Sequence, residues 1–112
     1  MGIFTSYQDP SRNETVAVGT SSVVISNARQ TDLNKRKVIS VRNMSPNAAD
    51  IITVNLGNGA AVADNGIVLK QYESFTDSND GDAENDKGYL CWQGSVTAIC
   101  ATATGTVSIF ER

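Results

Sequence analysis

Short apolar runs with a two-residue period, each closed by Gly, Asn, Asp or Pro, fill the chain between Lys37 and Glu111. This alternation places successive side chains on opposite faces of an extended backbone, whereas an amphipathic helix needs a period of about 3.6 residues. The pattern predicts short strands at residues 15–18, 22–26, 38–42, 51–56, 66–69, 88–92, 96–103 and 106–110. Because the connections are short, we expect an all-β fold, a two-layer antiparallel β-sandwich, with a jelly roll as the first topology and an Ig-like arrangement as the second.

The same alternation predicts which side chains fill the core. The inward positions are Ile39, Val41, Ile52, Val54, Leu56, Leu90, Ile99, Val107 and Ile109. Between two of these runs, Asp64-Asn65-Gly66 is a turn signal, since Asn-Gly supplies two positions that accept a positive φ.

Size and charge restrict the class of protein. With 112 residues the chain is one domain, which we divide into an extended N-terminal arm at residues 1–15 and a sandwich at 16–112. Nine basic and twelve acidic residues give a net charge of −3, which argues against nucleic acid as a partner because such binding depends on clustered Lys and Arg. No apolar run is long enough for a membrane span, and the first residues lack the pattern of a secretion signal.

The N-terminal arm carries large apolar side chains, Ile3, Phe4 and Tyr7, ahead of a turn signal at Asp9-Pro10. One interpretation is a frayed terminus. The other is docking on a neighbouring subunit or a larger assembly, because a disordered tail has no need of such side chains.

A basic cluster, Lys35-Arg36-Lys37, stands immediately before the run at 38–42. Three adjacent charges are typical of a solvated strand entrance, and the alternative is a contact with an acidic surface of a partner. The candidate partner-binding residues are therefore Ile3, Phe4, Tyr7, Lys35, Arg36 and Lys37.

The two cysteines, Cys91 and Cys100, fall on consecutive predicted strands. Free, buried thiols are the favoured state, since the expected compartment is reducing, and a disulfide across the hairpin is the alternative. A zinc site needs about four ligands, and the chain adds no histidine to its two cysteines.

An acidic segment at residues 77–87 is the one low-complexity stretch. Its carboxylates suggest calcium, with Asp80, Asp82 and Glu84 as the candidate ligands, although the EF-hand spacing is not met. A solvated loop is the favoured interpretation, so no metal site and no cofactor is predicted.

The residues that catalysis commonly uses are scarce. The chain has no histidine, and no Ser or Thr stands in a nucleophile motif, so we expect no enzyme. Tyr72, Tyr89 and Trp92 could form an aromatic platform for a sugar, but packing into the core is the more frequent use of such side chains.

Several segments together carry a family resemblance: residues 36–45 (RKVISVRNMS), 52–57 (ITVNLG), 66–75 (GIVLKQYESF) and 94–111 (GSVTAICATATGTVSIFE). This order of strands and turns resembles small β-sandwich virion proteins of tailed and related bacteriophages. The resemblance implies a capsid-associated decoration, cement or vertex protein that is commonly oligomeric, is made in the host cytoplasm and resides in the virion.

The first functional hypothesis is therefore a non-enzymatic structural protein of a bacteriophage particle, whose partners are the major capsid protein or other virion proteins and its own copies. The second is a carbohydrate- or receptor-binding module of a phage fibre or spike. An accessory domain of a cytosolic enzyme is a third possibility, because a fold does not determine a function.

Overall fold

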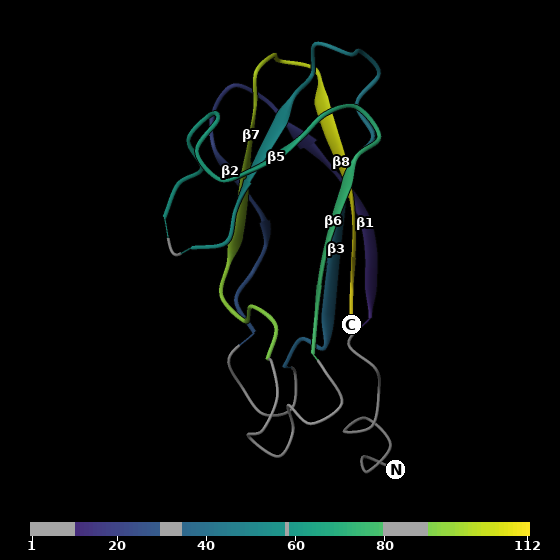
Figure 1. Ribbon diagram of the computed structural model, residues 1–112, viewed down its shortest axis with the longest axis vertical. Helices are drawn as coiled ribbons and strands as arrows, with labels where there is room; N and C mark the ends of the chain where they lie inside the picture. Colours follow the sequence, from purple (N-terminus) through teal and green to yellow (C-terminus); the bar gives the residue numbers. More distant parts are fainter. Residues whose placement is uncertain (1–10, 30–34, 58, 80–89) are drawn as a thin grey trace.

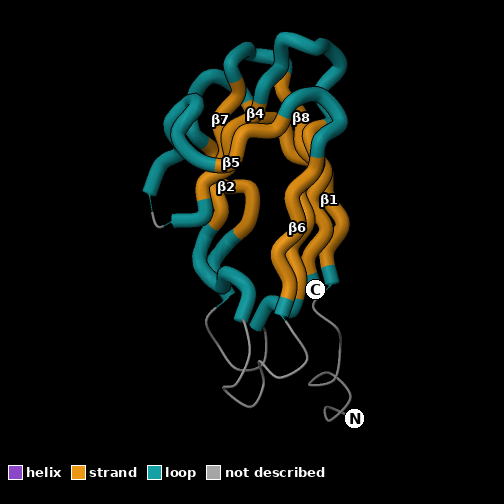
Figure 2. The backbone as a smooth tube through the Cα atoms, viewed as in Figure 1, coloured by secondary structure: helices purple, strands orange, loops and turns teal. Residues whose placement is uncertain are grey.

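The computed structural model describes residues 11–29, 35–57, 59–79 and 90–112, and these contain strands and no helix (Figure 1). The strands are β1 (Arg12–Val18), β2 (Val23–Ser26), β3 (Val38–Asn43), β4 (Ile52–Asn55), β5 (Ile67–Leu69), β6 (Ser74–Ser78), β7 (Val96–Cys100) and β8 (Gly105–Glu111). All eight belong to two four-stranded sheets that face each other (Figure 2), so the predicted all-β, two-layer sandwich is confirmed.

The strand order is β1-β8-β3-β6 in the first sheet and β2-β7-β4-β5 in the second, and neighbouring strands are antiparallel. The pairs β1–β8, β2–β7, β3–β6 and β4–β5 are nested, as in one long hairpin whose successive pairs alternate between the sheets. This order places β1 and β2 at one open side of the sandwich. The choice between a jelly roll and an Ig-like topology stays a prediction.

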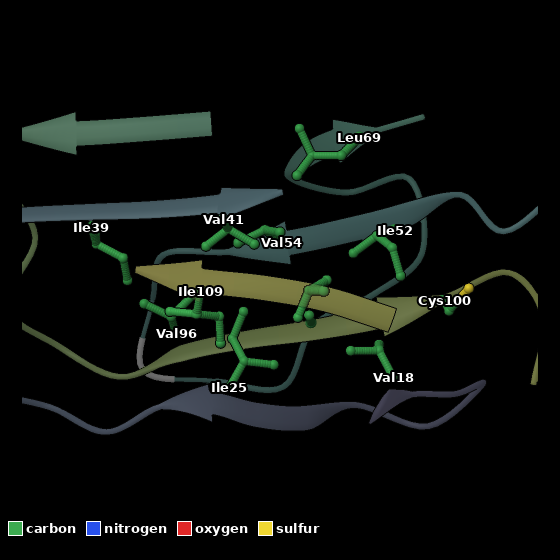
Figure 3. Packing of buried hydrophobic residues seen from close by; sticks show 12 residues of the cluster. Val18, Ile25, Ile39, Val41, Ile52, Val54, Leu69, Val96, Cys100 and Ile109 are labelled. Atoms are coloured by element: carbon green, nitrogen blue, oxygen red, sulfur yellow. The ribbon is translucent and has the colours of Figure 1, made fainter. Parts of the chain in front are cut away.

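The core lies between the sheets and follows the alternation (Figure 3). Six predicted core residues are 0% exposed, namely Ile39, Val41, Ile52, Val54, Val107 and Ile109. Leu56 packs at the margin of this cluster. Ile99 is only partly buried, because β7 turns Val96, Ala98 and Cys100 inward instead.

The predicted strand at 88–92 is wrong over its described residues. Residues 90–92 are irregular, and Leu90 is 43% exposed instead of buried. Side chains take the place of a neighbouring strand here: the backbone N–H of Cys91 donates to Asn79 Oδ1 (2.8 Å) and that of Trp92 donates to Asp77 Oδ2 (2.9 Å). Trp92 still packs against the core, whereas Tyr89 lies outside the described residues.

Two strand ends also differ from expectation. β1 begins at Arg12, so residues 12–15, which we assigned to the arm, pair with β8. β7 ends at Cys100, and the turn that follows is fixed to Asp50, whose carboxylate accepts hydrogen bonds from the hydroxyls of Thr102 and Thr104.

The predicted turn at 64–66 forms, but its positive φ angles do not both fall on Asn65 and Gly66 as expected. Positive φ occurs at Asp64 (63°) and at Gly66 (148°), not at Asn65. Asn65 N–H donates to the carbonyl of Val62 (3.0 Å). Gly66 also lies so close to β4 that an added Cβ would be 2.7 Å from the carbonyl oxygen of Val54, which explains glycine at this position.

Both cysteines are free and buried, as predicted. Cys91 Sγ donates to the carbonyl of Arg36 (3.1 Å), and burial raises the pKa of this thiol. Cys91 lies before β7 and Cys100 at its end, so they are not partners across a hairpin.

Replacing Ile52 or Ile109 by Ala should lower the free energy of unfolding by about 2 to 5 kcal/mol, because each substitution leaves a cavity in the core. Urea denaturation followed by circular dichroism measures the change. The control is Val68→Ala, at a side chain that is 41% exposed, which we expect to change stability by less than about 0.5 kcal/mol. Equal effects at all three positions would contradict this register.

Candidate functional site

The carboxylate of Glu111 lies inside the sandwich at the end of β8. Val107, Ile109 and Glu111 share the inward face of this strand, and Glu111 is 2% exposed. Its Oε2 accepts hydrogen bonds from Ser26 Oγ (2.6 Å) and Arg36 Nε (2.9 Å). Its Oε1 accepts from Arg12 Nη1 (2.9 Å) and Arg29 Nη2 (3.0 Å). One carboxylate thus connects both sheets and the segment that leads into β3.

Arg36 is fully buried, at 0% exposure, so it is not part of an exposed basic cluster and our assignment of it to a partner surface is corrected. Besides Glu111, its guanidinium donates to the carbonyls of Trp92 (2.6 Å), Gly94 (3.1 Å) and Asn27 (2.8 Å) and to Ser26 Oγ (2.9 Å). These contacts use every N–H of the guanidinium, which is the condition under which a buried charge is tolerated.

Ser26 reaches this cluster because β2 is irregular. The pairing register between β2 and β7 shifts between Val24 and Ser26, and the consecutive residues Ile25 and Ser26 are both buried. Such a bulge redirects one side chain of a strand. Here it sends Ile25 into the core and the Ser26 hydroxyl to Glu111.

Two opposing effects set the pKa of Glu111. Burial raises it, while hydrogen bonds from Ser26, Arg12 and Arg36 and the charge of Arg29 lower it by more, so the pKa lies below the ordinary value for glutamate. A general acid or base works best with a pKa near the operating pH. Glu111 is instead held ionised, and both of its carboxylate oxygens accept hydrogen bonds, which suits a structural role.

Arg12 extends the cluster to the open side of the sandwich. From β1, its Nη2 donates to the carbonyl of Ile25 in β2 (2.8 Å), and its Nε contacts Glu14 (2.7 Å). Next to this bridge lies a cleft of about 460 Å³, within the size range of ligand sites. Its lining is Arg12, Glu14, Val16, Val24, Ile25, Ser26, Asn27, Ala28, Arg29 and Glu111.

The structure brings together few of the residues we predicted for a site. Ile3, Phe4 and Tyr7 lie outside the described residues, as do the candidate calcium ligands Asp80, Asp82 and Glu84. Lys35 and Lys37 are exposed on either side of the buried Arg36. Among the described residues, no group of three or more His, Cys, Asp or Glu could hold a metal ion.

A second unusual feature is the turn from Lys70 to Glu73, where Tyr72 has a φ of 67° and is 55% exposed. Glu73 N–H donates to the carbonyl of Lys70 (3.0 Å), so Tyr72 occupies a turn position that normally takes Gly or Asn. Tyr72 N–H also donates to the carbonyl of Asn43 (2.7 Å), and Arg42 Nε donates to the carbonyl of Tyr72 (3.2 Å). The fold therefore holds an exposed aromatic ring in a strained backbone.

In comparisons with known proteins, no family model matches the chain, and neither a curated protein nor a solved structure matches it significantly. None of the described residues forms a helix long and apolar enough to cross a membrane.

The substitution Glu111→Gln should lower the free energy of unfolding by about 3 to 5 kcal/mol at neutral pH, since it leaves buried guanidinium groups without their anion. The matched control is Glu14→Gln, at a side chain that is 52% exposed and also contacts Arg12, where we expect a loss below about 1 kcal/mol. Thermal and urea unfolding measure the stability of both variants. A Glu111→Gln variant as stable as this control would contradict the structural role of Glu111.

The stability of the wild-type protein should fall in acid. Since the pKa of Glu111 is lower in the folded protein than in the unfolded chain, its contribution is complete above the unfolded pKa and is lost as the pH falls through the folded pKa. The pKa of Asp50 is lowered in the same direction, chiefly by the hydrogen bond from Thr102. Urea unfolding at a series of pH values should show a shallower acid dependence in Glu111→Gln, with the part due to Asp50 retained.

Replacing Tyr72 by Gly should raise the free energy of unfolding by about 1 kcal/mol, because glycine adopts the positive φ without strain. Tyr72→Ala removes the same ring and keeps the strained backbone, so it should give no increase. Urea denaturation of the two variants separates the contribution of the backbone from that of the ring.

Proposed function

We propose that this chain is a non-enzymatic structural protein of a bacteriophage particle, which decorates, cements or caps the capsid through protein–protein contacts. The nested strand order carries the proposal. Eight strands paired β1–β8, β2–β7, β3–β6 and β4–β5 in two sheets point to a jelly roll, an architecture used by viral capsid and lectin domains. The resemblance to small virion sandwiches directs the choice to a phage particle, with a capsid protein as partner.

The outer face of the second sheet supports a contact role. Val24 in β2 is 51% exposed and Val68 in β5 is 41% exposed. Their pairing partners, Thr97 and Thr53, point to the same face but are buried under the connection that follows β4. Val62, which is 56% exposed, belongs to the connection that follows β4. Two hydrogen bonds hold this connection to the outer face of the sheet. Thr97 Oγ1 donates to the carbonyl of Gly59, and the N–H of Asp64 donates to Thr53 Oγ1.

The outer face of the first sheet differs in chemistry. Its exposed positions include Thr15, Ser74, Thr76 and Ser108. Apolar side chains stabilise an interface by about 25 cal/mol per Å² removed from water, whereas hydroxyls exchange one set of hydrogen bonds for another. We therefore assign the capsid contact to the valine-bearing face of the second sheet.

The test is co-sedimentation with phage particles produced without this protein. The double variant Val62→Lys, Val68→Lys should reduce attachment at least tenfold, while Ser108→Lys, on the opposite face, should attach as the wild type does. Circular dichroism confirms that each variant is folded. Failure of the wild type to attach, or loss of attachment on Ser108→Lys alone, would contradict the proposal.

A second candidate function, a carbohydrate- or receptor-binding module of a fibre or spike, is favoured by the Tyr72 turn. A strained backbone that presents an exposed aromatic ring beside Arg42 fits a recognition surface, since aromatic rings and guanidinium groups are common contacts for ligands. A glycan array, run with and without calcium, should then show binding that Tyr72→Gly abolishes and Tyr72→Phe retains.

A further inference from the structure

The cleft between β1 and β2 combines an apolar wall with one charged end. Val16, Val24 and Ile25 form the apolar part of its lining. Arg12 and Glu111 stand at the end where β1 begins and β8 finishes. Ala28 is the fourth apolar residue of the lining, and the other six residues are polar or charged. The apolar wall is therefore one part of a mixed site, in which polar groups set the orientation of the bound segment.

Both strands that border the cleft are edge strands. Among the described residues, β1 pairs only with β8 and β2 pairs only with β7, so each has one side with no neighbouring strand. β1 is seven residues long. Open strand edges beside an apolar cleft are places where an extended segment can add backbone hydrogen bonds and insert alternate side chains.

The chain itself contains a segment suited to this cleft. Residues 1–10 lie outside the described residues and directly precede Ser11, where the described chain begins. They include Ile3, Phe4 and Tyr7. Aromatic side chains each bury about 150 to 250 Å² in a contact, so Phe4 and Tyr7 can supply much of the apolar contact area.

The position of Arg12 indicates that the segment comes from another copy. Its guanidinium spans from β1 to the carbonyl of Ile25 and to Glu111, next to the position where the described chain begins. The apolar wall at Val16 lies further along β1, beyond this bridge. A segment of a second copy can reach this wall from the open side without crossing the bridge.

We propose that residues 1–10 of a second copy dock in the cleft between β1 and β2, with Phe4 against the apolar wall. This inference rests on the proposed assembly function and adds to it a specific contact between subunits. Val62 and Val68 do not line the cleft, whereas Val24 does, so we restrict the capsid contact to Val62 and Val68 and assign Val24 to the arm contact.

Cysteine crosslinking of the full-length protein tests the contact. One preparation carries Phe4→Cys and the other Val24→Cys; mixing them under mild oxidation should give a disulfide-linked dimer between the two kinds of chain. The matched control replaces Val24→Cys by Val68→Cys, at a similarly exposed valine on the opposite edge of the same sheet, and should give at least tenfold less linked dimer. Cys91 and Cys100 are buried and present in all preparations.

Three outcomes overturn the docking proposal: no linked dimer with Val24→Cys, equal linkage with Val68→Cys, or linkage only within a chain that carries both Phe4→Cys and Val24→Cys. The particle experiment gives a separate readout. If the crosslink fails while the wild type still attaches to particles, the docking is wrong and the proposed function stands. If the crosslink forms while attachment fails, the proposed function is wrong and the docking stands.

Discussion

The carboxylate of Glu111 is the interaction on which the arrangement of the two sheets depends at one end of the sandwich. It binds Arg12 from β1, Ser26 from β2 and Arg36 from the entrance to β3, so removing it would leave several polar groups unsatisfied at once. A buried ion pair contributes little net stability compared with a well-packed apolar cluster, because desolvation offsets the attraction. We hypothesise that its value here is positional, and the Glu14→Gln control addresses that point, since an exposed carboxylate cannot fix strands relative to each other.

The polar cluster around Glu111 lies at the open side of the sandwich, next to the cleft. The apolar core occupies the middle of the two sheets, whereas the cluster around Glu111 replaces it where β1 starts and β8 ends. Arg12 in β1 donates to the carbonyl of Ile25 in β2 and so links the two edge strands across this open side. The cleft lies beside this bridge, and the guanidinium that forms the bridge also donates to Glu111.

The period of two predicted the sheets where a strand alternates apolar and polar side chains, as in β4, whose Ile52 and Val54 face the core and whose Thr53 and Asn55 face outward. It could not orient β7, whose residues are apolar on both faces, and the structure turns Ala98 inward and Ile99 outward. The site was harder to predict. Glu111 lies two residues after Ile109, on the inward side of the alternation, but a charged residue at a strand end is ordinarily solvated. Arg36 has no local signal at all, since the carboxylate that buries it is 75 residues away in the chain.

The four edges of the sandwich are unequal, and this gives assembly a direction. β5 has three residues, β2 four and β6 five, so these edges present short templates, whereas β1 presents seven. Short edges and charged side chains are the usual protection against unwanted pairing, and β1 carries Arg12 and Glu14 at its start. The apolar half of β1 lacks this protection. The proposed docking of residues 1–10 on this half of another copy would form a closed dimer if the exchange is reciprocal, and a ring or an open chain if it is not. Under the proposed function the partner at Val62 and Val68 is a larger shell, and these two valines lie outside the cleft at which a second copy would bind.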